Sequence, residues 1–279
     1  MRTYNDIYLS TRNLLRQNGV EAYSLEARVL VASAAGKTVQ QLLRDINLYT
    51  TAEVENRVLD YAARRLKGEP VAYITGSWEF YGLPLTITPD VLIPRMDTEV
   101  LVDAVKEILT GYKMDARVLD LCCGSGCIAV SAALALPGAQ VHASDLSAGA
   151  LAVTRQNAEA LGARITLHQG DLFAAVEGLH FHLIVSNPPY IPTAECAALQ
   201  QEVLREPAMA LDGGGDGLDF YRRIAREAPR HLLPGGAVFL EVGFDQAEAV
   251  CALLAAGGFT RTAIHPDLQG IGRMVEAHV

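Results

Sequence analysis

The chain has 279 residues, half of them apolar, with a formal charge of −9 and a pI near 5.3. This length allows one large domain or two smaller ones, and the apolar fraction is ample for a hydrophobic core. The acidic balance argues against a nucleic-acid backbone as the main partner, because phosphate binding needs clustered Lys and Arg.

The sequence also predicts the cellular compartment and the chemical state of the cysteines. No apolar run opens the chain and none is long enough to span a bilayer, so we expect a cytoplasmic protein with no membrane partner. Three of the five cysteines crowd together at Cys122, Cys123 and Cys127, without C-x2-C spacing or a nearby His pair. We therefore expect free thiols and no metal site.

Residues 1–68 are predicted to form a small helical domain. Apolar side chains at helical spacing indicate two helices, and a capping-box pattern at Thr50 and Glu53 predicts a third, which stops at Gly68. The basic run at 64–67 is expected to be solvated near the end of that helix, where cations are favoured. The positions that carry the spacing are Tyr4, Ile7, Tyr8, Leu14, Leu15, Ala27, Leu30, Val31, Ala34, Val54, Val58 and Ala62.

Residues 69–94 change character and are predicted to form a β-hairpin that links two domains. Strand-forming residues from Val71 onward are interrupted at Gly76, at 82–84 and at Pro89. Such punctuation is typical of short strands separated by turns.

Residues 95–279 are predicted to form an α/β domain. Asp97 or Thr98 is expected to cap its first helix, which runs to about Leu109. Strands and helices then alternate, which predicts a mostly parallel sheet with helices on both faces. The last two strands are expected to pair antiparallel through a turn around Pro266–Gly270. The predicted strands are 117–121, 140–144, 165–168, 182–186, 237–242, 259–265 and 272–278, and the later helices are 126–136, 148–161, 217–232 and 245–256.

The tetrapeptide Asn187-Pro188-Pro189-Tyr190 follows an apolar strand, at the edge where open α/β sheets place their ligands. Prolines have no N–H and a fixed φ, so the carbonyls around them stay available as acceptors in set directions. Asn187 adds a side-chain carbonyl and Tyr190 an aromatic face. This combination suits a planar NH2 group, such as a carboxamide or an exocyclic base amine. The alternative is a rigid turn that only ends the strand.

A second candidate site is the loop Cys122-Cys123-Gly124-Ser125-Gly126, which follows the first predicted strand of the alternating region. Its glycines allow a sharp turn and a close approach to a ligand. Asp145 ends the next strand, where an acid can accept hydrogens from both ribose hydroxyls of a nucleoside. The alternative role for Asp145 is the N-cap of the following helix.

Asp171 and Leu172 end the third strand, where they could hold the amine and one face of an adenine; the alternative is again a turn. The glycine loop lacks the full G-x-G-x-x-G pattern, and Ala129 leaves no obvious cradle for a pyrophosphate. S-adenosylmethionine, which has a ribose and an adenine but no phosphate, therefore fits better than NAD.

The order of these motifs resembles the class I S-adenosylmethionine-dependent methyltransferases that modify planar nitrogen, and more closely the release-factor glutamine methyltransferases. The resemblance covers nearly the whole chain, and motifs outside the generic fold make it specific. It implies a Rossmann-like sheet, mostly parallel with the last strand antiparallel, beside a small N-terminal helical domain and a linking hairpin. The specific motifs are residues 68–76, 79–82, 93–95, 97–99, 212–214 and 216–218.

The resemblance implies roles for the candidate residues. Cys122 to Gly126 would wrap the cofactor, Asp145 would bind its ribose, and Asp171-Leu172 would lie by the adenine. Asn187 to Tyr190 would hold a glutamine side chain, with Asn187 and the Pro188 carbonyl accepting both amide hydrogens; Asn187 would also contact the cofactor. The family often has Gly where Cys122 stands, an aromatic where Leu172 stands, and Pro where Met96 stands.

By the same resemblance, the reaction is methyl transfer to N5 of the glutamine in the Gly-Gly-Gln loop of peptide chain release factors. It would give N5-methylglutamine and S-adenosylhomocysteine. Residues 1–68 with the hairpin would recognise the protein substrate. The alternatives are a glutamine methyltransferase of a ribosomal protein, an exocyclic-amine methyltransferase of DNA or RNA, and a non-catalytic nucleotide-binding module. The acidic charge favours a protein substrate, with no direct nucleic-acid binding.

Overall fold

The computed structural model describes residues 2–110, 115–267 and 270–279. It divides into two compact units, Met1–Ser77 with Gln200–Arg205, and Trp78–Leu199 with Glu206–Val279. Within the described residues, every helix is too short or too polar to cross a lipid bilayer.

The first unit consists of helices. Two of the three predicted helices are confirmed at their predicted places, and the third begins at a different cap. The Thr51 side chain, not Thr50, accepts the hydrogen bond from Val54 N, at 3.3 Å, so the predicted capping box was wrong. A further helix at residues 39–44 was not predicted. The helices are α1 (Tyr4–Gln17), α2 (Tyr23–Ala34), α3 (Val39–Arg44), α4 (Ala52–Leu66) and α5 (Val71–Thr75).

Helix α5 corrects the prediction that Val71 begins a strand. Pro70 at its start and Gly76 at its end, with φ +70°, confine it to little more than one turn. Val71 and Ile74 are buried with Leu15 of α1. Packing of these side chains outweighs the β preference of their residue types, which is a weak determinant by itself.

Arg65 corrects the prediction of a solvated basic run. It is 7% exposed and forms ion pairs of 2.6 Å with Glu26 of α2 and Glu202 of the segment Gln200–Arg205. The neighbouring Arg64 pairs with Glu69 instead. The ion pair to Glu202 holds a segment that is distant in sequence to the helices of the first unit.

The second unit contains a seven-stranded sheet of order β5-β4-β3-β6-β7-β9-β8, which confirms the predicted fold class. Five strands run parallel, and β9 is antiparallel to both β7 and β8. A turn was predicted around Pro266–Gly270, between the last two strands. Its residues 268 and 269 lie outside the described residues. The strands are β3 (Arg117–Leu121), β4 (Gln140–Asp145), β5 (Ile165–Gln169), β6 (Phe181–Ser186), β7 (Leu232–Glu241), β8 (Arg261–Pro266) and β9 (Gly272–His278).

The predicted linker hairpin is shorter in the structure, with strands β1 (Ser77–Phe80) and β2 (Leu83–Thr86). The next helix begins differently from its prediction. A 3-10 turn, Met96–Thr98, precedes α6 (Glu99–Thr110), and Arg95 rather than Asp97 or Thr98 stands at the start of that turn.

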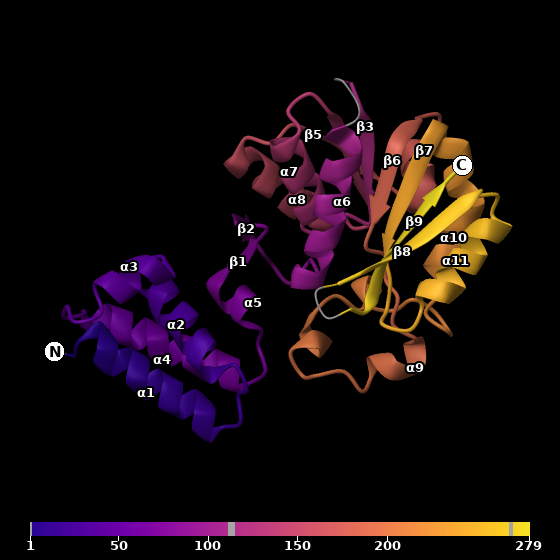
Figure 1. Ribbon diagram of the computed structural model, residues 1–279. Helices are drawn as coiled ribbons and strands as arrows, with labels where there is room; N and C mark the ends of the chain where they lie inside the picture. Colours follow the sequence, from indigo (N-terminus) through magenta and orange to yellow (C-terminus); the bar gives the residue numbers. More distant parts are fainter. Residues whose placement is uncertain (1, 111–114, 268–269) are drawn as a thin grey trace. The chain divides into compact units, whose positions relative to one another are not determined.

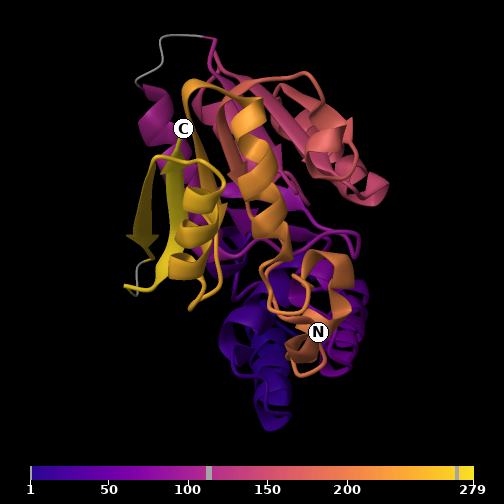
Figure 2. The ribbon, with the colours of Figure 1, turned by 90° about the vertical axis from the view of Figure 1, so that its right-hand side faces the viewer.

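Helices cover both faces of the sheet. One face carries α6, α7 (Cys127–Ala135) and α8 (Ala148–Leu161), and the other carries α10 (Asp219–Glu227) and α11 (Ala247–Ala256) (Figure 1). Figure 2 looks onto the face with α10 and α11, with the yellow β8–β9 pair at one edge. The chain goes outward from β3 to β5 and then returns to place β6 on the other side of β3. Ligands of such sheets bind where the strand order reverses, at the carboxyl ends of the strands.

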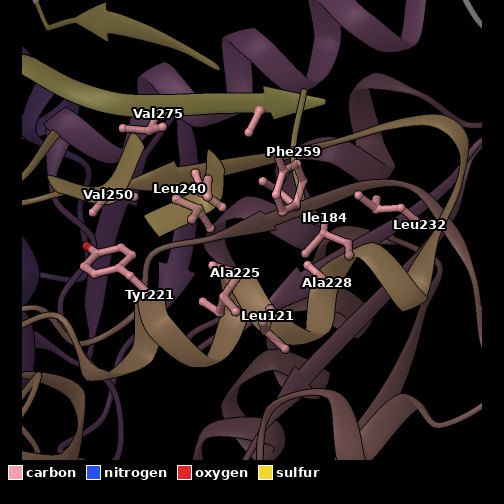
Figure 3. Close-up of a cluster of buried hydrophobic side chains, with 14 of the residues drawn as sticks. Leu121, Ile184, Tyr221, Ala225, Ala228, Leu232, Leu240, Val250, Phe259 and Val275 are labelled. Carbon is pink, nitrogen blue, oxygen red and sulfur yellow. The ribbon is translucent and has the colours of Figure 1, made fainter. Parts of the chain in front are cut away.

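Apolar side chains from α10, α11 and the sheet form the main core of this unit. Tyr221 of α10 packs near Leu240 of β7 and Val250 of α11 (Figure 3). Its ring is fully buried, and its hydroxyl donates a 2.7 Å hydrogen bond to the Glu241 carbonyl oxygen. The polar tip is therefore satisfied, and it fixes the end of β7.

Candidate active site

A cavity of about 490 Å³ lies at the carboxyl ends of β3, β4 and β6. It brings together most of the residues predicted from the sequence, although they come from separate loops. This volume is in the range of small-molecule sites. The predicted residues that line it are Cys122, Cys123, Gly124, Ser125, Asp145, Asp171, Leu172, Asn187 and Pro189.

The loop after β3 turns sharply at Cys122, Gly124 and Gly126, whose φ angles are +62°, +54° and +76°. A Cβ atom at Gly126 would lie 2.6 Å from Thr154 Cγ2, so the close approach of α7 and α8 requires glycine there. Cys122 adopts the left-handed region that few non-glycine residues occupy. The left-handed turns at these three positions, more than the identity of the side chains, bring the loop against the cavity.

Asp145 joins this loop to the end of β4. One carboxylate oxygen accepts from Gly124 N and the other from Ser147 N, both at 2.9 Å. Helix α8 is capped by Ser147, whose hydroxyl accepts from Ala150 N at 3.1 Å, so the N-cap alternative for Asp145 was wrong. Burial raises the pKa of Asp145, and the backbone hydrogen bonds partly offset that effect.

Asp171 and Leu172, which follow β5, also line the cavity. Leu172 is buried with φ +48°, and it offers an apolar surface to the cavity. Asp171 forms an ion pair of 2.8 Å with Arg223 of α10, which also lines the cavity. No local pattern in the sequence predicts this pair, because it depends on how α10 packs on the sheet.

The four residues after β6 divide into two groups. Asn187 and Pro189 line the cavity, whereas Pro188 and Tyr190 are not among its described lining residues. Tyr190 packs against the main core, its carbonyl oxygen accepts from Gln246 Nε2 at 2.9 Å, and burial raises the pKa of its hydroxyl to about 12.

A second loop supports the segment after Asn187. Gly213 N donates to Ile191 O at 2.8 Å, and Ile191 N donates to Leu211 O at 3.0 Å. A Cβ at Gly213 would lie 2.7 Å from Tyr190 Cα, and one at Gly217 would lie 2.3 Å from Tyr190 O. Two glycines therefore allow this loop to lie directly against the backbone of Tyr190.

Two polar groups near Asn187 were missed from the sequence. Asn187 Nδ2 donates to Thr98 Oγ1 at 3.2 Å, and Thr98 lines the cavity. Glu241, at the end of β7, is 2% exposed, and burial raises its pKa to about 7. The sequence feature that could have indicated Glu241 is a single acidic residue at the end of an apolar strand.

Two loops complete the cavity, from Asp90 to Pro94 and from Pro207 to Ala210. Glu206 connects them, because its carboxylate accepts from Ile93 N at 2.9 Å and pairs with Arg95 at 2.5 Å. The motif at residues 93–95 carries part of the family resemblance, but neither its place in the cavity nor that of the second loop was predicted.

The fold, the glycine loop and Asn187 at one cavity define a methyltransferase of class I. The family model for the methyltransferase small domain matches residues 96–218, and that for the PrmC N-terminal domain matches residues 6–76. A methyltransferase structure from Pyrococcus furiosus shares the fold, with a TM-score of 0.51 at 17% identity, over 78% of this chain and 98% of that one.

Curated relatives define the family more closely. The release factor glutamine methyltransferase of Geobacter sulfurreducens is 46% identical, over 96% of this chain and 94% of the relative. That of Bordetella pertussis is 47% identical, over 90% of this chain and 93% of the relative. The chain belongs to the family of release factor glutamine methyltransferases, which confirms the resemblance found in its motifs.

Proposed function

We propose that the chain methylates N5 of the glutamine in the Gly-Gly-Gln motif of peptide chain release factors, with S-adenosylmethionine as the methyl donor. Membership of the family, over nearly the whole chain, is the observation that carries this proposal. The shared cavity supports it, since the glycine loop and Asn187 come from different loops and line one space. The products are S-adenosylhomocysteine and N5-methylglutamine.

The residues present fit S-adenosylmethionine. Both oxygens of Asp145 are fixed by backbone N–H groups and keep a lone pair for the ribose hydroxyls. Leu172 and Ile128 offer apolar walls for an adenine. Arg223 is the cationic side chain among the described lining residues, and its ion pair with Asp171 leaves no cradle for a pyrophosphate. When bound, the cofactor supplies a methyl group activated by a sulfonium.

By the family resemblance, Asn187, which lines the cavity, and the carbonyl of Pro188, which is not among the described lining residues, would orient the substrate. An amide nitrogen is a weak nucleophile, because its lone pair is delocalised into the carbonyl. Two acceptors that hold both amide hydrogens would localise electron density on nitrogen and direct it at the methyl group. The nitrogen would take up the methyl group that the sulfonium supplies and would lose one hydrogen as a proton to water. The rate gain then comes from orientation and electrostatics.

We assign recognition of the release factor to residues 1–68 with the linker 69–94, and the chemistry to residues 95–279. The separate family-model matches, one over residues 6–76 and one over 96–218, support this division. In the structure the first unit also contains the segment Gln200–Arg205.

A labelled-methyl assay with purified components tests the function. The chain and S-adenosylmethionine should label an unmodified release factor on its Gly-Gly-Gln glutamine, and should not label a variant with alanine at that glutamine. Ribosomal proteins, DNA and RNA serve as competing substrates in parallel reactions. Label on one of these, with none on the release factor, would contradict the proposal.

A further inference from the structure

Glu241 lies beside Asn187 at the cavity edge of the sheet. Strands β6 and β7 are parallel neighbours, with Ser186 paired to Leu240, so Asn187 and Glu241 follow at the same edge. Thr98, at the end of the 3-10 turn before α6, comes against both of them. Thr98 and Glu241 are each 2% exposed. Three polar side chains from distant parts of the sequence therefore form one buried group behind the site.

The hydrogen bond between Asn187 and Thr98 has one possible direction, because an NH2 group can only donate. Asn187 Nδ2 donates to Thr98 Oγ1 at 3.2 Å, so the Thr98 hydroxyl has its own hydrogen to donate elsewhere. Burial raises the pKa of Glu241, and the neighbouring Thr98 and Asn187 side chains partly offset that rise, so both lie close to its carboxyl. The NH2 group of Asn187 is thus engaged with the protein. Its Oδ1 atom has no hydrogen bond within the described part of the chain, and Asn187 lines the cavity.

A carboxyl at this position is costly. Glu241 Oε2 is buried without a hydrogen-bond partner among the described residues, and burial raises the pKa of the group to about 7. Its strand neighbours Leu240 and Val242 are apolar and fully buried. An apolar residue would avoid the cost of burying a polar group without full pairing. The carboxyl therefore requires an explanation beyond packing.

We propose that Glu241 is a positioning residue. Through Thr98, it holds the Asn187 amide with its NH2 group toward the protein and its carbonyl oxygen toward the substrate. In the opposite orientation, Asn187 would present its own NH2 to the NH2 of the substrate glutamine, and two donors would face each other. This inference rests on the proposed function, because it assigns to the Asn187 oxygen the role of accepting a hydrogen from an amide.

The protonation state of Glu241 decides the direction of the hydrogen bonds. An ionised carboxyl only accepts, so Thr98 donates to it and can only accept from Asn187. A protonated carboxyl can donate to Thr98, whose hydrogen can then bond the Asn187 oxygen and turn the amide. The rate should therefore rise with pH through about 7, the pKa of Glu241. The other titratable or charged groups that act on Glu241 or feel its charge are Asp97, Cys127, Tyr190, Tyr221 and Arg273.

Glu241→Gln tests the proposal, with the exposed Glu248→Gln as the matched control. At pH 8 we expect kcat for the release factor to fall about 10- to 100-fold, as for a misplaced catalytic group. The dissociation constant of S-adenosylmethionine should stay within about threefold of wild type, since Glu241 does not line the cavity. The wild-type rate should rise between pH 6 and 8, whereas the variant should be flat. A wild-type kcat with an unchanged pH profile would overturn the proposal.

Thr98 gives a second test that does not depend on how Glu241→Gln folds. Thr98→Val removes the hydroxyl at nearly constant shape and should lower kcat as Glu241→Gln does. Thr98→Ser keeps the hydroxyl and should restore kcat to near wild type; equal rates for the two variants would contradict the relay. Failure of the wild-type chain to methylate the release factor would contradict the proposed function. An active wild type with an equally active Glu241→Gln variant would contradict only the positioning role.

Discussion

The N–H of Gly124 donates a 2.9 Å hydrogen bond to the Asp145 carboxylate, and this bond ties the glycine loop after β3 to the end of β4. The second carboxylate oxygen accepts from Ser147 N at 2.9 Å. One acid thus sets the shape of the cavity wall and offers the remaining lone pairs of its oxygens to a ligand.

Asp145→Asn should weaken binding of S-adenosylmethionine by about tenfold or more, the scale of a lost hydrogen bond to a charged group. Asparagine has one acceptor oxygen, so either Gly124 N or Ser147 N would face an NH2 group instead. Isothermal titration calorimetry measures the dissociation constant, with the exposed Asp60→Asn as control. Equal affinity in the two variants would show that the carboxylate serves only the fold.

Gly213→Ala should lower methyl transfer at least about tenfold, because displacement of positioning groups by an ångström is enough to slow a reaction to that extent. Its Cβ would lie 2.7 Å from Tyr190 Cα and 2.9 Å from Pro189 O, both backbone atoms that cannot yield easily. Gly215→Ala is the matched control, since a Cβ there meets nothing within 4 Å. Steady-state rates for both variants decide the point, and a normal rate for Gly213→Ala would contradict the role of this loop.

Arg65→Ala should destabilise the protein by about 1–3 kcal/mol, between the values for exposed and buried ion pairs, because Arg65 is buried whereas its two partners are partly exposed. Glu26 and Glu202 would both lose their cation. Arg57→Ala, which removes a more exposed pair with Glu53, should cost no more than about 1 kcal/mol. Urea denaturation measures both changes. If both variants lost a similarly small free energy of unfolding, the ion pairs of Arg65 would contribute little to stability.

Stability should fall as the pH rises from 5 to 8. Burial raises the pKa of Asp120 to about 8 from 3.8, and only the hydrogen bond from Ala129 N opposes it. The unfolded chain therefore releases this proton at a lower pH than the folded protein. As the pH increases, the unfolded state is stabilised relative to the folded state, and the free energy of unfolding falls. Glu241, with a pKa raised to about 7, acts in the same direction.

Asp120→Asn should remove part of this pH dependence. The amide oxygen can still accept from Ala129 N, and the group no longer titrates. Free energies of unfolding at pH 5 and pH 8 provide the measurement, and the difference between the two values should be smaller for the variant by a few kcal/mol at most. An identical difference in both proteins would place the Asp120 pKa near its ordinary value.

Much of the second unit could be predicted from the sequence, because its signals are local. Alternating strand and helix patterns located β3 and α8 at their observed bounds. In the first unit, α3 was missed although Thr38 and Gln41 form a capping box, since only Leu42 of this short helix is buried. Helix α5 was mistaken for a strand because its packing against α2 and α4 depends on tertiary contacts.

The candidate site was predicted where its residues are loop motifs and missed where they depend on packing. The glycine loop and Asn187 follow strands, and parallel strands end at one edge, so their meeting could be expected. Arg223 reaches Asp171 from a helix, and Thr98 reaches Asn187 from the start of another. Such pairs are set by how helices dock on the sheet, which no local pattern specifies.

Mass spectrometry of release factors from cells that lack this chain tests the central claim most directly. We expect an unmodified Gly-Gly-Gln glutamine in those cells, and one methyl group on its N5 atom when the wild-type chain is restored but not when Asn187→Ala is restored. A fully methylated glutamine in cells without the chain would show that another enzyme modifies it and would contradict the proposed function.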